Sequence, residues 1–122
     1  MELVLAEYRR NLANVRMEHR REAQRLAQEL AAMGASKVIL FGSVAQGRDS
    51  FSSDVDLVAI LDTVSVIPFH QRIVNALLAI EPTTKTDLLI YTTEEWNTLC
   101  VSRRFIRNEI LNKGVILYER PR

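Results

Sequence analysis

KVILFGSVAQGRDSFSSDVDLVAILD, residues 37–62, is the stretch that decides the fold. It opens with an apolar run at residues 38–41, whose length and β-branched content predict a buried strand. Gly42 and Ser43 then end the strand in a turn, where the glycine lets the backbone approach a ligand closely and the serine can cap the short segment behind it. The amides at such a helix start point toward a common position. We therefore expect an anion to bind at Gly42 and Ser43.

Two aspartates begin the next apolar segment, DVDLVAIL at residues 54–61. Side chains alternate between the two faces of a strand, so Asp54 and Asp56 point to the same side. Their Cα atoms are then roughly 6 to 7 Å apart, and both carboxylates can reach one divalent cation or a pair of cations. An anion-binding turn followed by two carboxylates suits the chemistry of a polyphosphate.

The glycine spacing also invites comparison with a P-loop, since four residues separate Gly42 from Gly47. Arg48 and Asp49 stand where that motif requires lysine and then serine or threonine. The lysine that grips phosphate and the hydroxyl that binds magnesium are therefore missing, and the P-loop is excluded. The aspartate pair taken alone is also compatible with two solvated loop residues, and the longer pattern favours a site.

An apolar strand, Gly42-Ser43, ten residues and then DVDL at residues 54–57 together resemble the signature of the DNA polymerase β-like nucleotidyltransferase superfamily. Within it, the chain is similar to the minimal nucleotidyltransferases, small proteins typically encoded beside a helical HEPN-domain partner. The resemblance covers residues 38–91 well and extends loosely to the C-terminus. It implies the nucleotidyltransferase fold and a third carboxylate on a neighbouring strand, for which Asp87 in TKTDLLIYT is the matching candidate.

The whole chain has the size and composition of one domain, residues 1–122, with 48% hydrophobic residues. Its 16 Lys and Arg against 15 Asp and Glu give no basic field that indicates nucleic-acid binding. The single cysteine, Cys100, excludes an internal disulfide and suits a reducing compartment. Charges stud the N-terminus and no apolar stretch approaches spanning length, so we expect a cytoplasmic protein without a membrane segment.

Residues 1–34 predict a long N-terminal helix that ends at Gly34, because residues 3–33 contain no Pro or Gly and carry apolar side chains at spacings of three and four. The second half is expected to pack on the sheet. The first half either belongs to the core or docks a partner or a second copy of the chain through Leu5, Tyr8, Leu12 and Val15. His19 is expected to be an ordinary residue of the helix face, since no second histidine lies at metal-binding spacing.

The remaining segments predict a helix over FHQRIVNALLAI after Pro68, a strand over TKTDLLIYT and a helix that begins near Thr93. A further helix is expected at residues 102–112, closed by Gly114, and then a short strand at residues 115–118. The expected architecture is therefore α/β, or more finely α+β: a mixed sheet of about four strands with helices mainly on one face.

Three acids that converge on one position repel each other, and divalent cations that neutralise them best explain such a cluster. Mg²⁺ is expected, because it accepts a few carboxylates and completes its shell with water and triphosphate oxygens. We assign Asp54 and Asp56 to two metal ions, and Asp87 to the ion that activates an acceptor hydroxyl. That oxygen attacks the α-phosphorus in line and pyrophosphate leaves, while Gly42 and Ser43 hold the β and γ phosphates.

The resemblance implies an antitoxin that transfers AMP from ATP to a tyrosine of a HEPN ribonuclease toxin. The chain departs from many relatives at Val44 and Gln46, where they carry arginines, so triphosphate binding or acceptor docking can differ. Two other classes remain open. One is a small-molecule nucleotidyltransferase of the antibiotic-modifying type, and the other is a non-catalytic subunit that neutralises its partner by contact alone.

Overall fold

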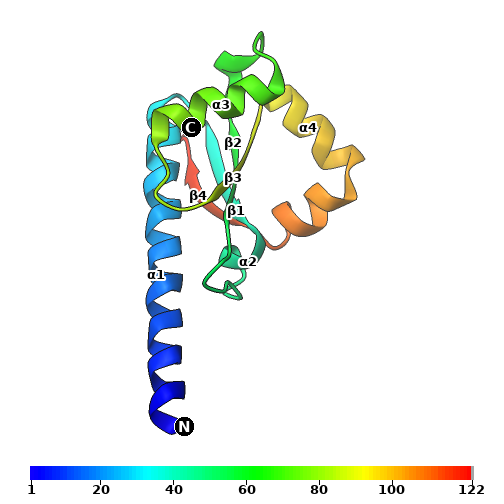
Figure 1. Ribbon diagram of the computed structural model, residues 1–122. Coiled ribbons are helices and arrows are strands. Elements are labelled where there is room, and N and C mark those ends of the chain that lie inside the picture. Colours follow the sequence, from blue (N-terminus) through cyan, green and yellow to red (C-terminus); the bar gives the residue numbers. More distant parts are fainter. Residues whose placement is uncertain (122) are drawn as a thin grey trace.

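The computed structural model describes residues 1–121 and is built around a four-stranded sheet (Figure 1). The strands lie in the order β3-β2-β1-β4. β1 is antiparallel to both β2 and β4, whereas β2 and β3 run parallel and are joined by a helix, as a parallel pair requires. The predicted mixed sheet of four strands is confirmed. The strands are β1 (Lys37–Phe41), β2 (Val55–Ile60), β3 (Thr86–Tyr91) and β4 (Val115–Glu119).

Helices cover both faces of this sheet. The two long helices, α1 and α3, pack on one face, and the shorter α4 and η2 pack on the other. The helices are thus mainly on one face, as expected, and short segments complete the second. The helical elements are α1 (Glu2–Ala32), α2 (Gly42–Ala45), a 3-10 turn η1 (Asp62–Val64), α3 (Phe69–Ile80), α4 (Thr93–Ser102) and a π-helical segment η2 (Ile106–Leu111).

The side chains of β2 alternate between these two layers, as the period of a strand requires. Val55, Leu57 and Ala59 are buried in the core that includes α1 and α3. Val58 and Ile60 are buried on the other face, with Trp96 of α4 and two isoleucines of η2. Asp56 lies between Val55 and Leu57, which face α1 and α3. Its side chain therefore points to the opposite face of the sheet, the one covered by α4 and η2.

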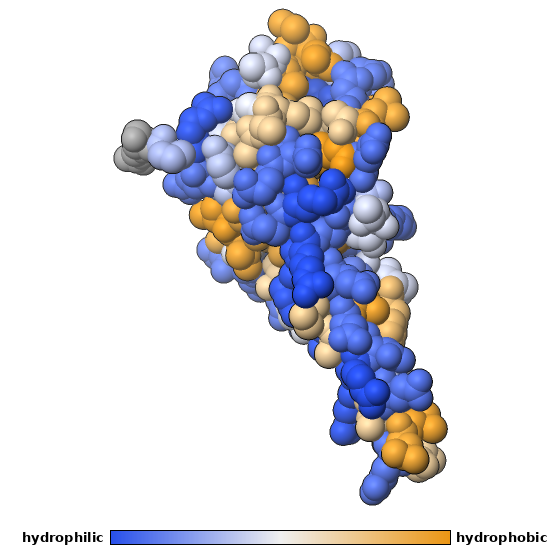
Figure 2. Space-filling model, turned by 90° about the vertical axis from the view of Figure 1, so that its left-hand side faces the viewer, coloured by the Kyte–Doolittle hydropathy of each residue, from blue (hydrophilic) through white to orange (hydrophobic). Residues whose placement is uncertain are grey.

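The first half of α1 projects beyond the sheet (Figures 1 and 2). No residue before His19 is buried, and Tyr8 is 53% exposed. Figure 2 shows this projection as a mostly hydrophilic arm with apolar side chains near its end. The second half packs on the sheet through Ala23, Leu26 and Leu30, so the expected division of the helix is confirmed. Within residues 1–121, no helix combines the length and apolar content needed to cross a membrane.

The C-terminal helical region differs from the expected single helix at residues 102–112. α4 ends at Ser102, Arg103 is extended, and η2 begins a few residues later. The Arg107 guanidinium donates to the carbonyl oxygens of Cys100 and Val101, which satisfies groups that the end of α4 leaves free. The break turns the chain so that the isoleucines of η2 reach the sheet, an outcome that depends on tertiary contacts rather than on local pattern.

Candidate active site

Asp56 and Asp87 are cross-strand neighbours. Asp56 pairs with Asp87 in the parallel register of β2 and β3, and strands in a sheet lie about 4.8 Å apart. Side chains opposite each other in this register point to the same face, and Asp54 precedes the first residue of β2. The structure thus brings the three predicted carboxylates together where β2 and β3 begin. Asp54 and Asp56 are half-buried, and Asp87 is exposed.

The glycine turn lies directly against this group. Phe41, the last residue of β1, pairs with Asp56, so the chain turns beside that carboxylate. Gly42 has a φ of 75°, and a Cβ atom added there would lie only 2.2 Å from Asp56 Oδ2. A side chain at this position would therefore be strained by its backbone and would overlap the carboxylate. The close approach that the sequence predicted for Gly42 is an approach to the chain's own catalytic candidate.

Ser43 occupies a different place from the one expected. The N-cap of α2 is Phe41, without a side-chain cap, and Ser43 already lies inside this four-residue helix. The reason is that Gly42 turns the chain immediately after β1, so the N-cap lies two residues earlier than expected, at Phe41 rather than Ser43. The Ser43 carbonyl oxygen accepts a hydrogen bond of 2.9 Å from the Arg48 amide, which closes the turn. Ser43 is half-buried and directly follows Gly42, the residue that lies against the Asp56 carboxylate.

The surroundings of Asp56 make its carboxylate harder to ionise. Burial, and then the carboxylates of Asp87 and Asp54, raise the pKa of Asp56 from 3.8 to about 6. The ammonium group of Lys85 lies 3.6 Å from Asp54 Oδ2, but Lys85 is 84% exposed and offers weak compensation. Ionisation of Asp56 in the folded protein therefore costs free energy. A cation that binds beside the carboxylate would reduce this cost.

The donor set fits Mg²⁺, which binds carboxylate oxygens, although the side chains are not drawn into a closed cage. Among residues 1–121, no three His, Cys, Asp or Glu side chains are close enough together to hold a metal ion as they stand. The three carboxylates lie where β2 and β3 begin, close enough for Asp87 and Asp54 to add to the effect of burial on the pKa of Asp56. The residue types fit Mg²⁺, and Asp54, Asp56 and Asp87 are the residues that would hold it.

Comparison with known proteins identifies the family and the fold. The family model described as "Polymerase beta, Nucleotidyltransferase" matches residues 24–122. The chain belongs to this nucleotidyltransferase family. A crystal structure of a candidate nucleotidyltransferase from Sulfolobus solfataricus has a similar fold, with a TM-score of 0.60 and 15% sequence identity, over 88% of this chain and 86% of that one. No protein of curated function matches the sequence.

The family match of this nucleotidyltransferase begins within α1, at residue 24. It includes the sheet and all three carboxylates, but the projecting half of α1 and His19 precede it. His19 is not the ordinary helix-face residue that the sequence predicted: it is 5% exposed, and its ring lies against Asp49. The two residues are 30 positions apart, so helical periodicity contained no signal for the contact.

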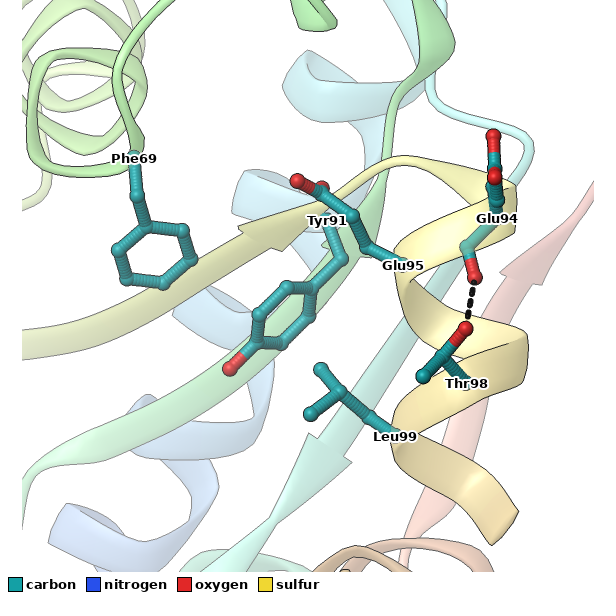
Figure 3. Close-up of a pocket in the computed structure, with 6 residues that line it drawn as sticks. All are labelled: Phe69, Tyr91, Glu94, Glu95, Thr98 and Leu99. Atoms are coloured by element: carbon teal, nitrogen blue, oxygen red, sulfur yellow. Dashed lines mark hydrogen bonds between the residues drawn. The ribbon is translucent and has the colours of Figure 1, made fainter. Parts of the chain in front are cut away.

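A separate hollow of about 390 Å³ lies at the other end of β3 (Figure 3). The rings of Phe69 and Tyr91 stack there with their centroids 5.2 Å apart, and burial followed by the Glu95 carboxylate raises the pKa of Tyr91. Tyr91 lies four residues beyond Asp87 on the same face of the nucleotidyltransferase sheet, about 13 Å away along the strand. The lining contains none of the three predicted acids; it consists of Phe69, Tyr91, Glu94, Glu95, Thr98 and Leu99.

Proposed function

We propose that the protein transfers a nucleoside monophosphate, AMP from ATP, to a hydroxyl acceptor with the help of Mg²⁺. The observation that carries this proposal is the register of Asp56 and Asp87 beside the tight turn at Gly42. Membership of the nucleotidyltransferase family supports nucleotidyl transfer in general. ATP as the donor is the finer part of the proposal.

Asp54, Asp56 and Asp87 would hold Mg²⁺, which when bound neutralises triphosphate charge and favours ionisation of the acceptor hydroxyl. Asp87 is the exposed member of the group, so it is the carboxylate that an incoming hydroxyl can reach, orient and pass its proton to. Gly42 lies against Asp56 and Ser43 follows it, so the amide and hydroxyl donors of this turn would bind phosphate oxygens. The new P–O bond forms at the α-phosphorus as the bond to pyrophosphate breaks in line.

The residues that replace the arginines of many relatives have distinct environments. Val44 is 2% exposed and belongs to the hydrophobic core, so this position faces away from any phosphate. Gln46 accepts a hydrogen bond of 2.6 Å from the exposed Arg48 guanidinium. The Arg48 guanidinium therefore lies next to the position where many relatives carry an arginine. Arg48 is our candidate for the cation that assists triphosphate binding.

We further propose that the acceptor is a tyrosine of a HEPN-domain toxin, that the protein acts as its antitoxin, and that both work in the cytoplasm. The exposure of Asp87 supports an acceptor that arrives on another protein. The projecting half of α1 offers a surface for such a partner, because it exposes large apolar side chains and a groove of about 450 Å³. That groove combines three arginines with apolar side chains; its lining is Arg9, Leu12, Ala13, Arg16, Met17 and Arg20. The same surface could hold a second copy of the chain.

A small-molecule acceptor is the second candidate, and the hollow beside Tyr91 is the observation that favours it. The hollow opens on the sheet face that carries Asp56 and Asp87, and its stacked aromatic rings suit a small organic molecule (Figure 3). A protein acceptor and a small-molecule acceptor are distinguished by which of them receives the labelled nucleotide.

The test is transfer of α-labelled ATP, with Mg²⁺, into a lysate of the source cells, followed by denaturing electrophoresis and thin-layer chromatography. We expect one labelled protein band. The transfer rate should fall at least about a hundredfold in Asp56→Asn, because this variant removes one of the three proposed carboxylate ligands of Mg²⁺. Glu29→Gln makes the same chemical change at an exposed carboxylate of α1 and is expected to retain activity.

A labelled small molecule in place of the protein band would select the second candidate. Full activity of Asp56→Asn, or no transfer from any of the four nucleotides, would overturn the proposed function. If Asp56→Asn still neutralised the partner completely in cells, inhibition by contact alone would replace the catalytic account.

A further inference from the structure

A buried polar cluster joins α1 to the loop that leads into the active site. Asp49 is fully buried, and its Oδ2 atom lies 2.7 Å from Nδ1 of His19, which is itself 5% exposed. Arg16 completes the cluster: its Nε atom donates to the Asp49 carbonyl oxygen at 2.8 Å and lies 3.6 Å from Oδ1 of the same residue. α1 therefore holds both the side chain and the backbone of Asp49.

The position of Asp49 in the chain makes this attachment significant. The loop between α2 and β2 begins just after the turn at Gly42 and Ser43 and ends with Asp54, so its two ends carry the two halves of the candidate site. The residues on either side of Asp49, Arg48 and Ser50, make hydrogen bonds toward the two ends of the loop. On one side the Arg48 amide donates to the Ser43 carbonyl, and on the other a turn links Ser50 and Ser53 through their backbone and hydroxyl groups.

Stability alone is a poor explanation for this cluster. Oδ1 of Asp49 is buried and accepts no hydrogen bond from residues 1–121, although Arg16 Nε lies 3.6 Å away, and a buried polar atom without a hydrogen bond is destabilising. Buried charge pairs are often replaced by apolar residues without loss of stability, and their best-attested benefit is to select one arrangement over others. Here the arrangement selected is the placement of the loop on α1.

We propose that His19 and Asp49 are positioning residues for nucleotidyl transfer: together they hold the loop so that the turn at Ser43 and the carboxylate of Asp54 face each other. The inference rests on the proposed function. His19 precedes the residues that match the family model, so this attachment is a contribution of the N-terminal helix. A displacement of about 1 Å in a catalytic group can reduce a rate about a hundredfold, which makes such an anchor effective.

The first test compares transfer rates at saturating ATP in His19→Ala, Asp49→Ala and His19→Asn. We expect both alanine variants to lose at least about tenfold in rate, and His19→Asn to recover most of it, because an asparagine amide can donate to Asp49 from nearly the position of Nδ1. Ile80→Val, which trims a buried side chain of α3, is the control for general destabilisation and should retain the rate of the unmodified protein.

The second test is amide hydrogen exchange, which needs no transfer activity. His19→Ala and His19→Asn give different expectations: the alanine variant should accelerate exchange at Arg48 and Ser53, whereas the asparagine variant should not. The Leu61 amide, which donates to Tyr91 in the sheet, should stay protected in both. Should His19→Ala fail to fold, Asp49→Ala takes its place in the exchange experiment, because it removes the same contact from the loop side and should likewise accelerate exchange at Arg48 and Ser53.

The outcomes separate the two claims. An active unmodified protein with equally active alanine variants overturns the positioning role and leaves the proposed function intact. An unmodified protein that transfers nothing overturns the proposed function, and hydrogen exchange then decides the anchoring role: unchanged protection at Arg48 and Ser53 in His19→Ala rejects it. Equal losses in His19→Asn and His19→Ala also reject it, because the rescue depends on the restored hydrogen bond.

Discussion

Removal of the Asp56 charge should make the protein more stable while it destroys the site. The unfolded chain releases the Asp56 proton with a pKa of 3.8, whereas the folded chain holds it to about pH 6. Between these values the folded state binds more protons, so the free energy of unfolding falls as pH rises from about 4 to about 6 and stays low above that. Asn cannot ionise, and Asp56→Asn therefore escapes this loss.

The size of the effect follows from the same pKa. A rise from 3.8 to about 6, at about 1.4 kcal/mol for each unit, corresponds to about 3 kcal/mol if solvent screens nothing. Asp56 is half-buried, so water reduces the penalty, and we expect a gain of about 1 to 3 kcal/mol at pH 7.5. Below about pH 4, both proteins have a neutral side chain at this position and the gain should vanish.

The assay is urea unfolding of the unmodified protein and Asp56→Asn in EDTA at pH 7.5, 6, 5 and 4. Glu29→Gln, an exposed carboxylate on α1, should stay within about 0.5 kcal/mol of the unmodified protein throughout. Addition of Mg²⁺ should narrow the gap at pH 7.5, because only the unmodified protein has the full set of acids. An Asp56→Asn variant that is no more stable than the unmodified protein at pH 7.5, or a gain that does not depend on pH, would refute the reasoning.

Two further predictions concern the surroundings of the site, and a third concerns the ion pair at the other end of β3. Gly42→Ala should lose transfer and about 2 kcal/mol or more of stability, because its Cβ atom would overlap Asp56. Gly47→Ala has a similar φ of 69° but no atom within 4 Å of the new Cβ, so urea unfolding should show only the backbone cost of about 1 kcal/mol. Lys85→Gln should strengthen Mg²⁺ binding a few-fold in calorimetry, since it removes a competing positive charge 3.6 Å from Asp54. Glu95→Gln should cost about 1 to 3 kcal/mol, because it leaves the buried Arg72 without its carboxylate partner. Arg72 lowers the pKa of Glu95 below 4.5, so this contribution should be complete above pH 4.5 and be lost as acid titrates the pair.

The local pattern of the sequence was sufficient for the elements that carry the acids. Successive side chains of a strand point to opposite faces, so a strand at residues 54–61 necessarily places Asp54 and Asp56 on the same side. The register that sets Asp87 opposite Asp56 could not be derived in this way, since the crossover through α3 determines it. It came from the family resemblance.

Two of the features that sequence reasoning missed depend on contacts between residues distant in the chain. The burial of His19 results from a loop residue 30 positions away, and the break after Ser102 lets η2 reach the sheet. The shift of the α2 N-cap from Ser43 to Phe41 has a local cause, because a glycine with positive φ at position 42 turns the chain two residues sooner than a cap at Ser43 would.

The most direct measurement of the central claim compares two labels on ATP. The protein is incubated with Mg²⁺ and source-cell lysate, once with label on the α-phosphate and once with label on the γ-phosphate. Nucleotidyl transfer at Asp54, Asp56 and Asp87 predicts that the acceptor gains the α label, that the γ label leaves as pyrophosphate, and that Asp56→Asn does neither. Incorporation of the γ label without the α label, or α transfer that survives Asp56→Asn, would contradict the assignment of this edge of the sheet as the site of nucleotidyl transfer.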